Sequence, residues 1–324
     1  MSYVELLPPE EAVPSNEKWH LLRRQGISAS EIAAVLGISP WESPFSAYWR
    51  KVNGWDVEAN AEMTAGRYAE RAIVDWYANE CDPHESLVLA PAGLYASSTQ
   101  GWQLATPDML LCTGCDECDI GGSCFCGTPH LGRVMSLLEC KYLVGGWDGW
   151  GEPLTDEIPV YYRAQCLWQL DVMGVDEVSV AAWHSAEFRH YIVRRDEKDL
   201  RVMRAAGRDF MDRLLSGDPP PLDSHIATLR ALKTLHPDVD DVEAEVDPDV
   251  AKGWRDARAR KAEAEADERA YEAKLRDAMG RAKRAVCAGE RVATRVVSEI
   301  AERTQTVAAH RRDYLLAPRE RKTS

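Results

Sequence analysis

Two stretches decide the fold of this chain, Ala105-Thr-Pro-Asp108 and Arg133-Val-Met-Ser-Leu-Leu-Glu-Cys-Lys141. The first places a carboxylate directly after a proline, at a predicted turn. The second predicts a strand, in which side chains at positions i and i+2 point the same way. Glu139 and Lys141 should therefore share one face, with the backbone carbonyl of Cys140 between them.

These residues favour a metal site. Asp108 and Glu139 offer hard oxygen ligands for Mg²⁺ or Mn²⁺, with the Cys140 carbonyl as a further donor. Lys141 would then orient, or help to deprotonate, an attacking water while the metal polarises a phosphate. Each residue alone is ordinary, since an Asp after Pro forms many turns and an exposed Glu-x-Lys is usually solvated. The combination predicts metal-assisted hydrolysis of a phosphodiester.

A segment near the start of the chain suits an anion. Ser28-Ala-Ser30-Glu31 begins a short apolar helix that we expect to end at Gly37, and Ser28 with Glu31 fits a capping box. A helix N-terminus offers free N–H groups and partial positive charge, which suits a phosphate.

Two further helices carry polar residues at informative places. The segment 66–77 has a helical apolar stripe with Glu70 at its edge, from where its carboxylate could reach a metal through water. In the segment 161–172, Gln165 lines up with apolar residues on one face. A Gln that points inward needs hydrogen-bond partners.

Five segments together resemble the PD-(D/E)xK nuclease core, in the YqaJ-like branch that includes the phage lambda exonuclease. They are Trp19-His-Leu-Leu-Arg23 with its continuation to Gly37, Gly66-Arg-Tyr-Ala-Glu70, Ala105-Thr-Pro-Asp108, Leu138-Glu-Cys-Lys141 and Pro159-Val-Tyr-Tyr-Arg-Ala-Gln165 with its continuation to Gln169. The resemblance covers residues 17 to 215. It implies an α/β fold with a restriction-endonuclease-like core, a central mixed sheet flanked by helices.

The resemblance also implies roles for single residues. Asp108, Glu139 and the Cys140 carbonyl would ligate Mg²⁺, Lys141 would act on the water, and Glu70 and Gln165 would complete the outer shell.

On the same resemblance, the terminal 5′-phosphate would be received by Arg23, Ser30 and Thr106, with Ser28 in the same site. The implied activity is 5′–3′ degradation of linear double-stranded DNA in phage-type recombination. The implied partners are DNA ends, a single-strand annealing protein and further copies of the chain, because the best-known member of the family is a trimer.

Three alternatives remain open at this point. An endonuclease of the same fold would cut internally, in repair or restriction. A DNA-binding regulator is suggested by residues 26–39, which alone resemble part of a helix-turn-helix. It needs a recognition helix directly after Ser39, where Pro40 and Pro44 are hostile to a helix interior. The third is a non-catalytic scaffold that binds DNA through its cysteines.

The overall charge bears on these alternative functions but does not choose among them. The net charge of −14 over 324 residues argues against a general nucleic-acid coat. Much of the acid is concentrated in residues 238–249, outside the predicted catalytic core. A local basic groove can coexist with an acidic total.

Five cysteines are crowded between the two deciding stretches, in the spacing C-x2-C-x2-C-x5-C-x-C. A loop with so few apolar residues would fold around a thiolate-bound Zn²⁺, with an iron–sulfur cluster or free thiols as alternatives. The candidate ligands are Cys112, Cys115, Cys118, Cys124 and Cys126, with His130 as a substitute. Nine cysteines without a secretory signal or an 18-residue apolar stretch favour the cytoplasm, that of the host for a phage protein, and no membrane.

The predicted organisation has four parts. Residues 1–16 are expected to be loose, 17–222 to form the nuclease core with a cysteine-rich insert at 112–130, 223–250 to form an acidic linker, and 251–324 to form a helical extension with a terminal strand region. Strands are expected at 87–96, 102–111, 133–141, 176–183 and 188–195, and helices at 197–216 and 251–286, the last stopped by Gly289 and followed by a strand at 291–298.

Overall fold

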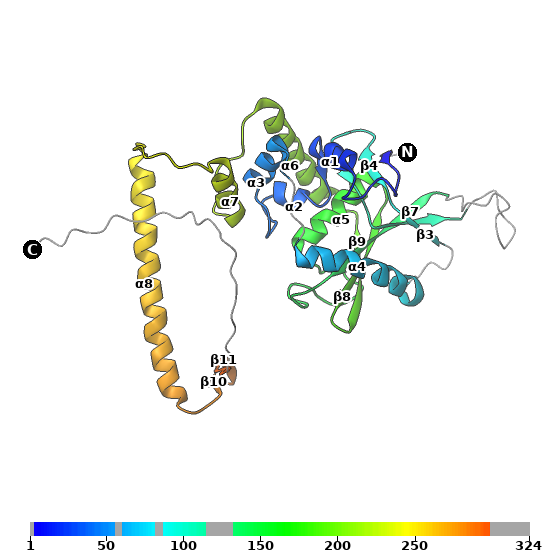
Figure 1. Cartoon of the computed structure of the whole chain (residues 1–324). Coiled ribbons are helices and arrows are strands. Elements are labelled where there is room, and N and C mark those ends of the chain that lie inside the picture. The colour runs from blue at the N-terminus through cyan, green and yellow to red at the C-terminus, as the bar shows by residue number, and fades with distance from the viewer. Residues whose placement is uncertain (1–2, 56–59, 82–86, 115–131, 299–324) are drawn as a thin grey trace, which may run out of the picture. The chain divides into compact units, whose positions relative to one another are not determined.

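The computed structural model describes residues 3–55, 60–81, 87–114 and 132–298. The chain divides into two compact units, Met1–Pro237 and Asp238–Ser324, which are described separately (Figure 1). Among the described residues, no helix combines the length and the apolar character that a membrane span requires.

A five-stranded mixed sheet forms the centre of the first unit. Its strand order is β3-β6-β7-β8-β9, and only β7 and β8 run parallel. Parallel neighbours need a crossover connection, which here contains helix α5 (Val160–Met173). The strands are β3 (Leu87–Pro91), β6 (Met109–Thr113), β7 (Val134–Tyr142), β8 (Glu177–His184) and β9 (Glu187–Arg194). The predicted α/β class with a central mixed sheet is confirmed.

A second, four-stranded sheet has the order β1-β4-β5-β2. Its strands are β1 (Tyr3–Leu7), β4 (Leu94–Ser97), β5 (Gln103–Ala105) and β2 (Ile27–Ser28). The strands expected at 87–96 and 102–111 are therefore each two strands in different sheets. Pro91 and Pro107 stand at the two breaks, where a residue without an N–H cannot continue a ladder. The N-terminal segment expected to be loose contains β1, whose Leu7 is fully buried.

Helices cover both faces of the five-stranded sheet (Figure 1). Helix α4 (Ala61–Trp76) packs on β7 and β8, where Leu138 contributes to the core. Leu137, the next residue along β7, points to the opposite face and joins the core around α5. Glu139 and Lys141 share the strand parity of Leu137, so they also face α5. The alternation along one strand thus directs the polar pair toward this helix.

Further helices complete the first unit. They are α1 (Glu17–Arg24), α2 (Ile32–Val35), α3 (Pro44–Asn53), α6 (Glu197–Ser216) and α7 (Ile226–Leu235), and a π-helical turn, Tyr77–Cys81, extends α4. Helix α6 has the predicted bounds. Helix α7 occupies part of the segment expected to be a linker and packs on α3, where the hydroxyls of Ser43 and Thr228 lie 2.6 Å apart.

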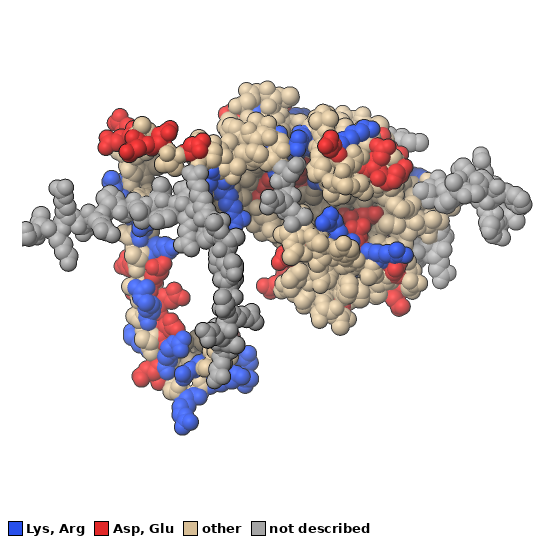
Figure 2. All heavy atoms as spheres, viewed as in Figure 1, with Lys and Arg blue, Asp and Glu red and all other residues tan. Residues whose placement is uncertain are grey.

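The second unit contains α8 (Pro248–Met279) and a hairpin of β10 (Arg284–Cys287) and β11 (Glu290–Thr294). The predicted helix thus ends at Met279 and not at 286. Ala288 and Gly289 both have positive φ and form the hairpin turn, so this glycine turns the chain between two strands. Acidic side chains gather near the start of α8 and basic ones around the hairpin (Figure 2).

Candidate active site

Asp108 lies at the turn between β5 and β6, opposite the end of β7. The backbone N–H of Cys140 donates a 2.6 Å hydrogen bond to its Oδ2 atom. The register of the sheet explains this contact, because Met109 on β6 pairs with Leu138 on β7. The two deciding stretches of the sequence are therefore neighbours in space.

Glu139 is the centre of a hydrogen-bonded cluster and is only 3% exposed. Its Oε1 atom accepts from Lys141 Nζ at 2.5 Å and from Gln165 Nε2 at 2.6 Å. Its Oε2 atom accepts from Gln169 Nε2 at 2.7 Å. Sequence reasoning missed Gln169, although it stands one helical turn after Gln165 and would share its face.

Lys141 is enclosed by carboxylates and an aromatic ring. Its Nζ atom lies 4.7 Å from the ring centroid of Tyr162, a residue that sequence reasoning also missed, and donates to Gln165 Oε1 at 3.1 Å. Burial alone would lower the pKa of Lys141, but Glu139 and then Asp108 raise it above its ordinary value. In the metal-free protein the side chain is therefore an ammonium group, which can orient a water by donating a hydrogen bond to it.

Three carboxylates repel one another in this cluster. Burial, and then the charges of Glu139 and Glu70, raise the pKa of Asp108 well above its usual range. Burial and the charge of Glu139 also raise the pKa of Glu70. A divalent cation would relieve this repulsion, and the oxygen donors present match the preference of Mg²⁺ or Mn²⁺.

The geometry also shows what cation binding requires. Among the described residues, no group of three or more His, Cys, Asp and Glu side chains stands arranged to hold a metal ion. Both oxygens of Glu139 already accept hydrogen bonds from protein donors, one of them from Lys141. The ammonium group thus compensates part of the charge that a metal would neutralise. The Oε2 atom of Glu139 accepts one hydrogen bond, from Gln169, and keeps a lone pair that a metal could use.

One cavity of about 660 Å³ lies beside this cluster. Its lining includes seven of the predicted site residues: Glu70, Asp108 and Gln165 from the catalytic set, and Arg23, Ser28, Ser30 and Thr106 from the phosphate set. Arg67 and Arg71 of α4 also line it and were missed by sequence reasoning. They stand on either side of Glu70 in the sequence, in a segment already predicted to contribute to the site. Positive charge near the carboxylate cluster could therefore have been predicted from this segment.

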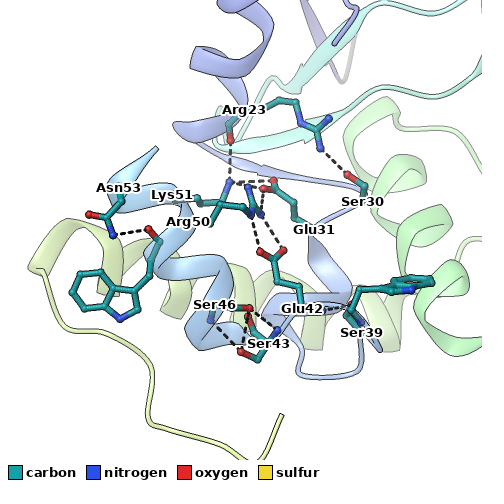
Figure 3. A network of polar contacts seen from close by, with 12 residues as sticks. Arg23, Ser30, Glu31, Ser39, Glu42, Ser43, Ser46, Arg50, Lys51 and Asn53 are labelled. Carbon is teal, nitrogen blue, oxygen red and sulfur yellow. Dashed lines mark hydrogen bonds and ion pairs between the residues drawn. The ribbon is translucent and has the colours of Figure 1, made fainter. Parts of the chain in front are cut away.

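The smaller sheet brings the predicted phosphate-binding residues together. The Nη2 atom of Arg23 donates to Ser30 Oγ at 2.7 Å (Figure 3). The same atom donates to Ser28 Oγ at 2.9 Å, and the guanidinium lies over the Trp19 ring at 4.2 Å. Ser28 on β2 pairs in parallel with Leu104 on β5, two residues before Thr106. This pairing therefore places Ser28, and with it Arg23 and Ser30, near the turn that contains Thr106 and Asp108.

The predicted capping box is only half formed. The Glu31 carboxylate accepts from the Ser28 N–H at 2.9 Å, as expected, but the Ser28 hydroxyl donates to the same carboxylate at 2.7 Å. The N–H of Glu31 bonds instead to the Ser28 carbonyl. Helix α2 has four residues, so the Arg23 guanidinium is the stronger attraction for an anion here.

Comparison with known proteins identifies this part of the chain. Residues 18–176 match the model of the YqaJ-like viral recombinase domain. This stretch belongs to that family. The matched range contains the predicted catalytic residues and the predicted phosphate-binding residues.

Individual relatives are distant. An uncharacterized protein, YqaJ, of Bacillus subtilis strain 168 is 22% identical over 245 residues, covering 71% of this chain and 66% of that protein. The chain thus spans just under two thirds of the length of this curated relative. An alkaline exonuclease from Laribacter hongkongensis is similar in structure with a TM-score of 0.46 and 18% identity, over 63% of this chain and 94% of that one. A phage-related exonuclease from Haemophilus somnus 129PT has a TM-score of 0.39 and 11% identity, over 59% and 96% of the two chains.

The segment of the YqaJ-like domain that resembles a helix-turn-helix has a different role in the fold. A helix does follow Ser39, because Pro44 occupies the first turn of α3, where proline is tolerated, and Ser43 caps it. The expectation that prolines prevent a helix there is corrected. However, α3 buries Phe45 and Tyr48, and its Arg50 is paired with two carboxylates. This face of the helix is committed to the core and not to a DNA groove.

The cysteine-rich insert of the YqaJ-like domain falls largely outside the described residues. Cys115, Cys118, Cys124, Cys126 and His130 all lie in 115–131, so the predicted zinc site stays a prediction. Cys112 is described, lies on β6 and is 1% exposed in the core. Burial raises the pKa of its thiol, which disfavours the thiolate that a metal ligand requires.

Proposed function

We propose that this chain is a metal-dependent deoxyribonuclease, specifically a 5′–3′ exonuclease that degrades linear double-stranded DNA in phage-type recombination. The supporting observation is the single cavity whose lining joins the carboxylate cluster to the Arg23, Ser30 and Thr106 group. A scissile phosphodiester and a terminal phosphate can then be bound at neighbouring positions of one strand.

The chemistry divides between the two sides of the cavity. Asp108, Glu139 and the Cys140 carbonyl would hold Mg²⁺ or Mn²⁺, which supplies Lewis-acid activation of the phosphate. Lys141 donates to the attacking water and stabilises the charge that develops on the phosphate oxygens. Gln165 and Gln169 fix the Glu139 carboxylate, and Glu70 accepts a hydrogen bond from a water in the outer shell.

The predicted phosphate-binding residues around Arg23 favour an exonuclease over an endonuclease of the same fold. A terminal phosphate monoester carries about −1.5 to −2 charge, against about −1 for an internal phosphodiester. Arg23 and the adjacent Ser30 hydroxyl offer donors that a terminal phosphate would use. Arg67 and Arg71 line the same cavity and add positive charge. The match to a YqaJ-like viral recombinase domain supports a role in recombination. The partner that we propose for this role is a single-strand annealing protein.

Incubation with labelled DNA tests the proposal. Linear duplexes labelled at the 5′ or the 3′ end and a covalently closed circle are incubated with the protein, with and without Mg²⁺. We expect early release of the 5′ label as mononucleotide, late release of the 3′ label, and an intact circle. Cleavage of the circle would favour the endonuclease, and binding without any metal-dependent product would favour the non-catalytic alternative.

A further inference from the structure

A buried network of charged residues lies next to Arg23 and Ser30 (Figure 3). Glu31 is 5% exposed and Lys51 is 7% exposed, although charged side chains are almost never buried without a partner. Arg50 donates to Glu31 Oε1 at 2.6 Å and to both oxygens of Glu42, at 2.7 and 3.0 Å. Glu31 lies directly before α2, Glu42 lies just before α3, and Arg50 and Lys51 lie in α3. The network therefore connects α3 to the Glu31 carboxylate.

Glu31 fixes the direction of the Ser28 hydroxyl. An ionised carboxylate only accepts hydrogen bonds, so the 2.7 Å contact uses the single hydroxyl proton of Ser28. The lone pairs of that oxygen are then free to accept from Arg23 Nη2 at 2.9 Å. Ser28 therefore orients Arg23 and has no proton left for an anion.

Ser30 differs from Ser28 in this respect. Its Oγ atom accepts from Arg23 at 2.7 Å and lies 3.2 Å from Ser28 Oγ. No carboxylate of the described residues takes its proton, so the hydroxyl can turn and donate to an anion in the cavity that both residues line.

Lys51 fixes the backbone from which Arg23 projects. Its Nζ atom donates to the Arg23 carbonyl at 2.9 Å and to the Gly26 carbonyl at 2.7 Å, and lies 3.0 Å from Glu31 Oε1. The three N–H donors of the ammonium group are thus matched by three acceptors. One buried side chain links the end of α1 to the Ser28 turn through Glu31.

The charges of the network leave a surplus at the cavity. Arg23, Arg50 and Lys51 supply three positive charges, against the two negative charges of Glu31 and Glu42. Arg50 and Lys51 each form an ion pair with Glu31, whereas none of the described carboxylates is paired with Arg23. The uncompensated positive charge therefore belongs to Arg23, which is the cation of this network that lines the cavity.

We infer that Glu31 and Lys51 are positioning residues that preorganise Arg23 and Ser30 to receive a terminal phosphate, with Ser28 acting through Arg23 and not as a phosphate donor. The inference rests on the proposed function for the identity of the anion. It predicts that end recognition and chemistry are separable. The side chains of Glu139 and Lys141 hydrogen-bond to each other and to Gln165 and Gln169, and none of the residues of this network takes part.

Binding without metal tests this inference independently of hydrolysis. Fluorescence anisotropy measures the affinity for a 5′-phosphorylated duplex oligonucleotide and for its 5′-hydroxyl counterpart. We expect wild type to prefer the phosphorylated end by about tenfold or more, the size expected of charge-assisted hydrogen bonds. Glu31→Gln, Lys51→Met and Ser28→Ala should each reduce this ratio, with affinity for the hydroxyl end unchanged.

A matched control is available in the same unit. Asp171 is also a buried carboxylate shared by two arginines, Arg195 and Arg204, so Asp171→Asn disturbs a comparable network elsewhere. It should lower stability without changing the ratio of affinities. Because Glu31→Gln and Ser28→Ala act on one hydrogen bond, their effects on the ratio should not add in the double variant.

Three results would overturn the inference: equal wild-type affinity for the two ends, an unchanged ratio in folded Ser28→Ala and Glu31→Gln proteins, or an equal loss of affinity for both ends. Circular dichroism establishes that each variant is folded. Failure of the proposed function looks different, since a protein that prefers phosphorylated ends but releases no product with Mg²⁺ would retain the phosphate site without the nuclease.

Discussion

The backbone N–H of Cys140 donates to Asp108 Oδ2 at 2.6 Å, so one carboxylate is fixed by the amide that lies between Glu139 and Lys141. This contact sets the distance between the two deciding stretches independently of any side-chain rotamer on β7. Residue 140 therefore contributes through its backbone, and the identity of its side chain should matter little for chemistry. Its thiol faces the core on the other side of the sheet.

Replacement of Lys141 by Ala should abolish cleavage. The change removes the ammonium group that donates to the water and stabilises the developing charge, and the loss of one such donor costs about 10²- to 10³-fold in rate. Gln165 and Gln169 still donate to Glu139, so the fold should persist. Product release from linear DNA with Mg²⁺ gives the rate, and anisotropy gives DNA binding. The exposed Lys198→Ala serves as control, and near-normal cleavage by Lys141→Ala would contradict the assigned role.

Replacement of Asp108 by Asn should stabilise the metal-free protein while removing activity. Burial and the neighbouring carboxylates disfavour the charged form of Asp108, which is why its pKa is raised. An amide oxygen still accepts from the Cys140 N–H but carries no charge, so the free energy of unfolding should rise by about 1 kcal/mol, as is common where a functional site stores strain. Urea unfolding in EDTA measures this. A loss of stability would show that the carboxylate repulsion is not a cost to the fold.

Much of the site was predictable because its elements are local. The strand parity of Glu139 and Lys141, the turn at Asp108 and the helix of Gln165 each follow from a few neighbouring residues. Contacts between distant parts of the chain could not be predicted from the sequence. Helical spacing places Gln169 on the face of Gln165, but its hydrogen bond to Glu139 depends on how α5 lies against β7. The hydrogen bond of Lys51 to the Gly26 carbonyl likewise depends on the position of α3.

The errors of the sequence analysis have a common cause. Pro44 was expected to prevent a helix but lies in the first turn of α3. Pro91 and Pro107 were not recognised as interruptions, although each divides a predicted strand between two sheets. The assignment of a strand to a sheet depends on tertiary pairing, which no local pattern encodes. The N-terminal segment was misjudged for the same reason, since β1 is ordered by its pairing with β4.

The buried His190 predicts a pH dependence of stability. Its Nε2 atom lies 3.1 Å from Ser179 Oγ, and burial lowers its pKa below the ordinary value. Below about pH 6.5 the unfolded state therefore binds more protons than the folded state, and stability falls as the pH falls, by at most about 1.4 kcal/mol per pH unit. Urea unfolding at a series of pH values measures the slope.

Comparison of variants isolates this effect from other titrating groups. His190→Gln should flatten the dependence between about pH 6.5 and 5, while the exposed His236→Gln should leave it unchanged. An identical slope in wild type and His190→Gln would show that another group is responsible.

Because Cys112 is buried in the core, it is a poor candidate among the five predicted cysteine ligands of zinc. A thiol inside the core is poorly placed to ligate a metal. Cys115, Cys118, Cys124 and Cys126 remain as thiol candidates for a tetrahedral site, with His130 as a substitute. Elemental analysis of purified protein should give about one zinc per chain. Cys112→Ser should keep the metal and Cys118→Ser should lose it. Iron in place of zinc would indicate a cluster, and no metal would remove the site.

The central claim is that Asp108 and Glu139 bind one divalent cation together, and calorimetric titration with Mn²⁺ in the absence of DNA tests it most directly. Wild type should bind the cation, Asp108→Asn and Glu139→Gln should each abolish binding, and Asp171→Asn should bind as wild type does. Undiminished Mn²⁺ binding by folded Asp108→Asn and Glu139→Gln proteins would contradict the account.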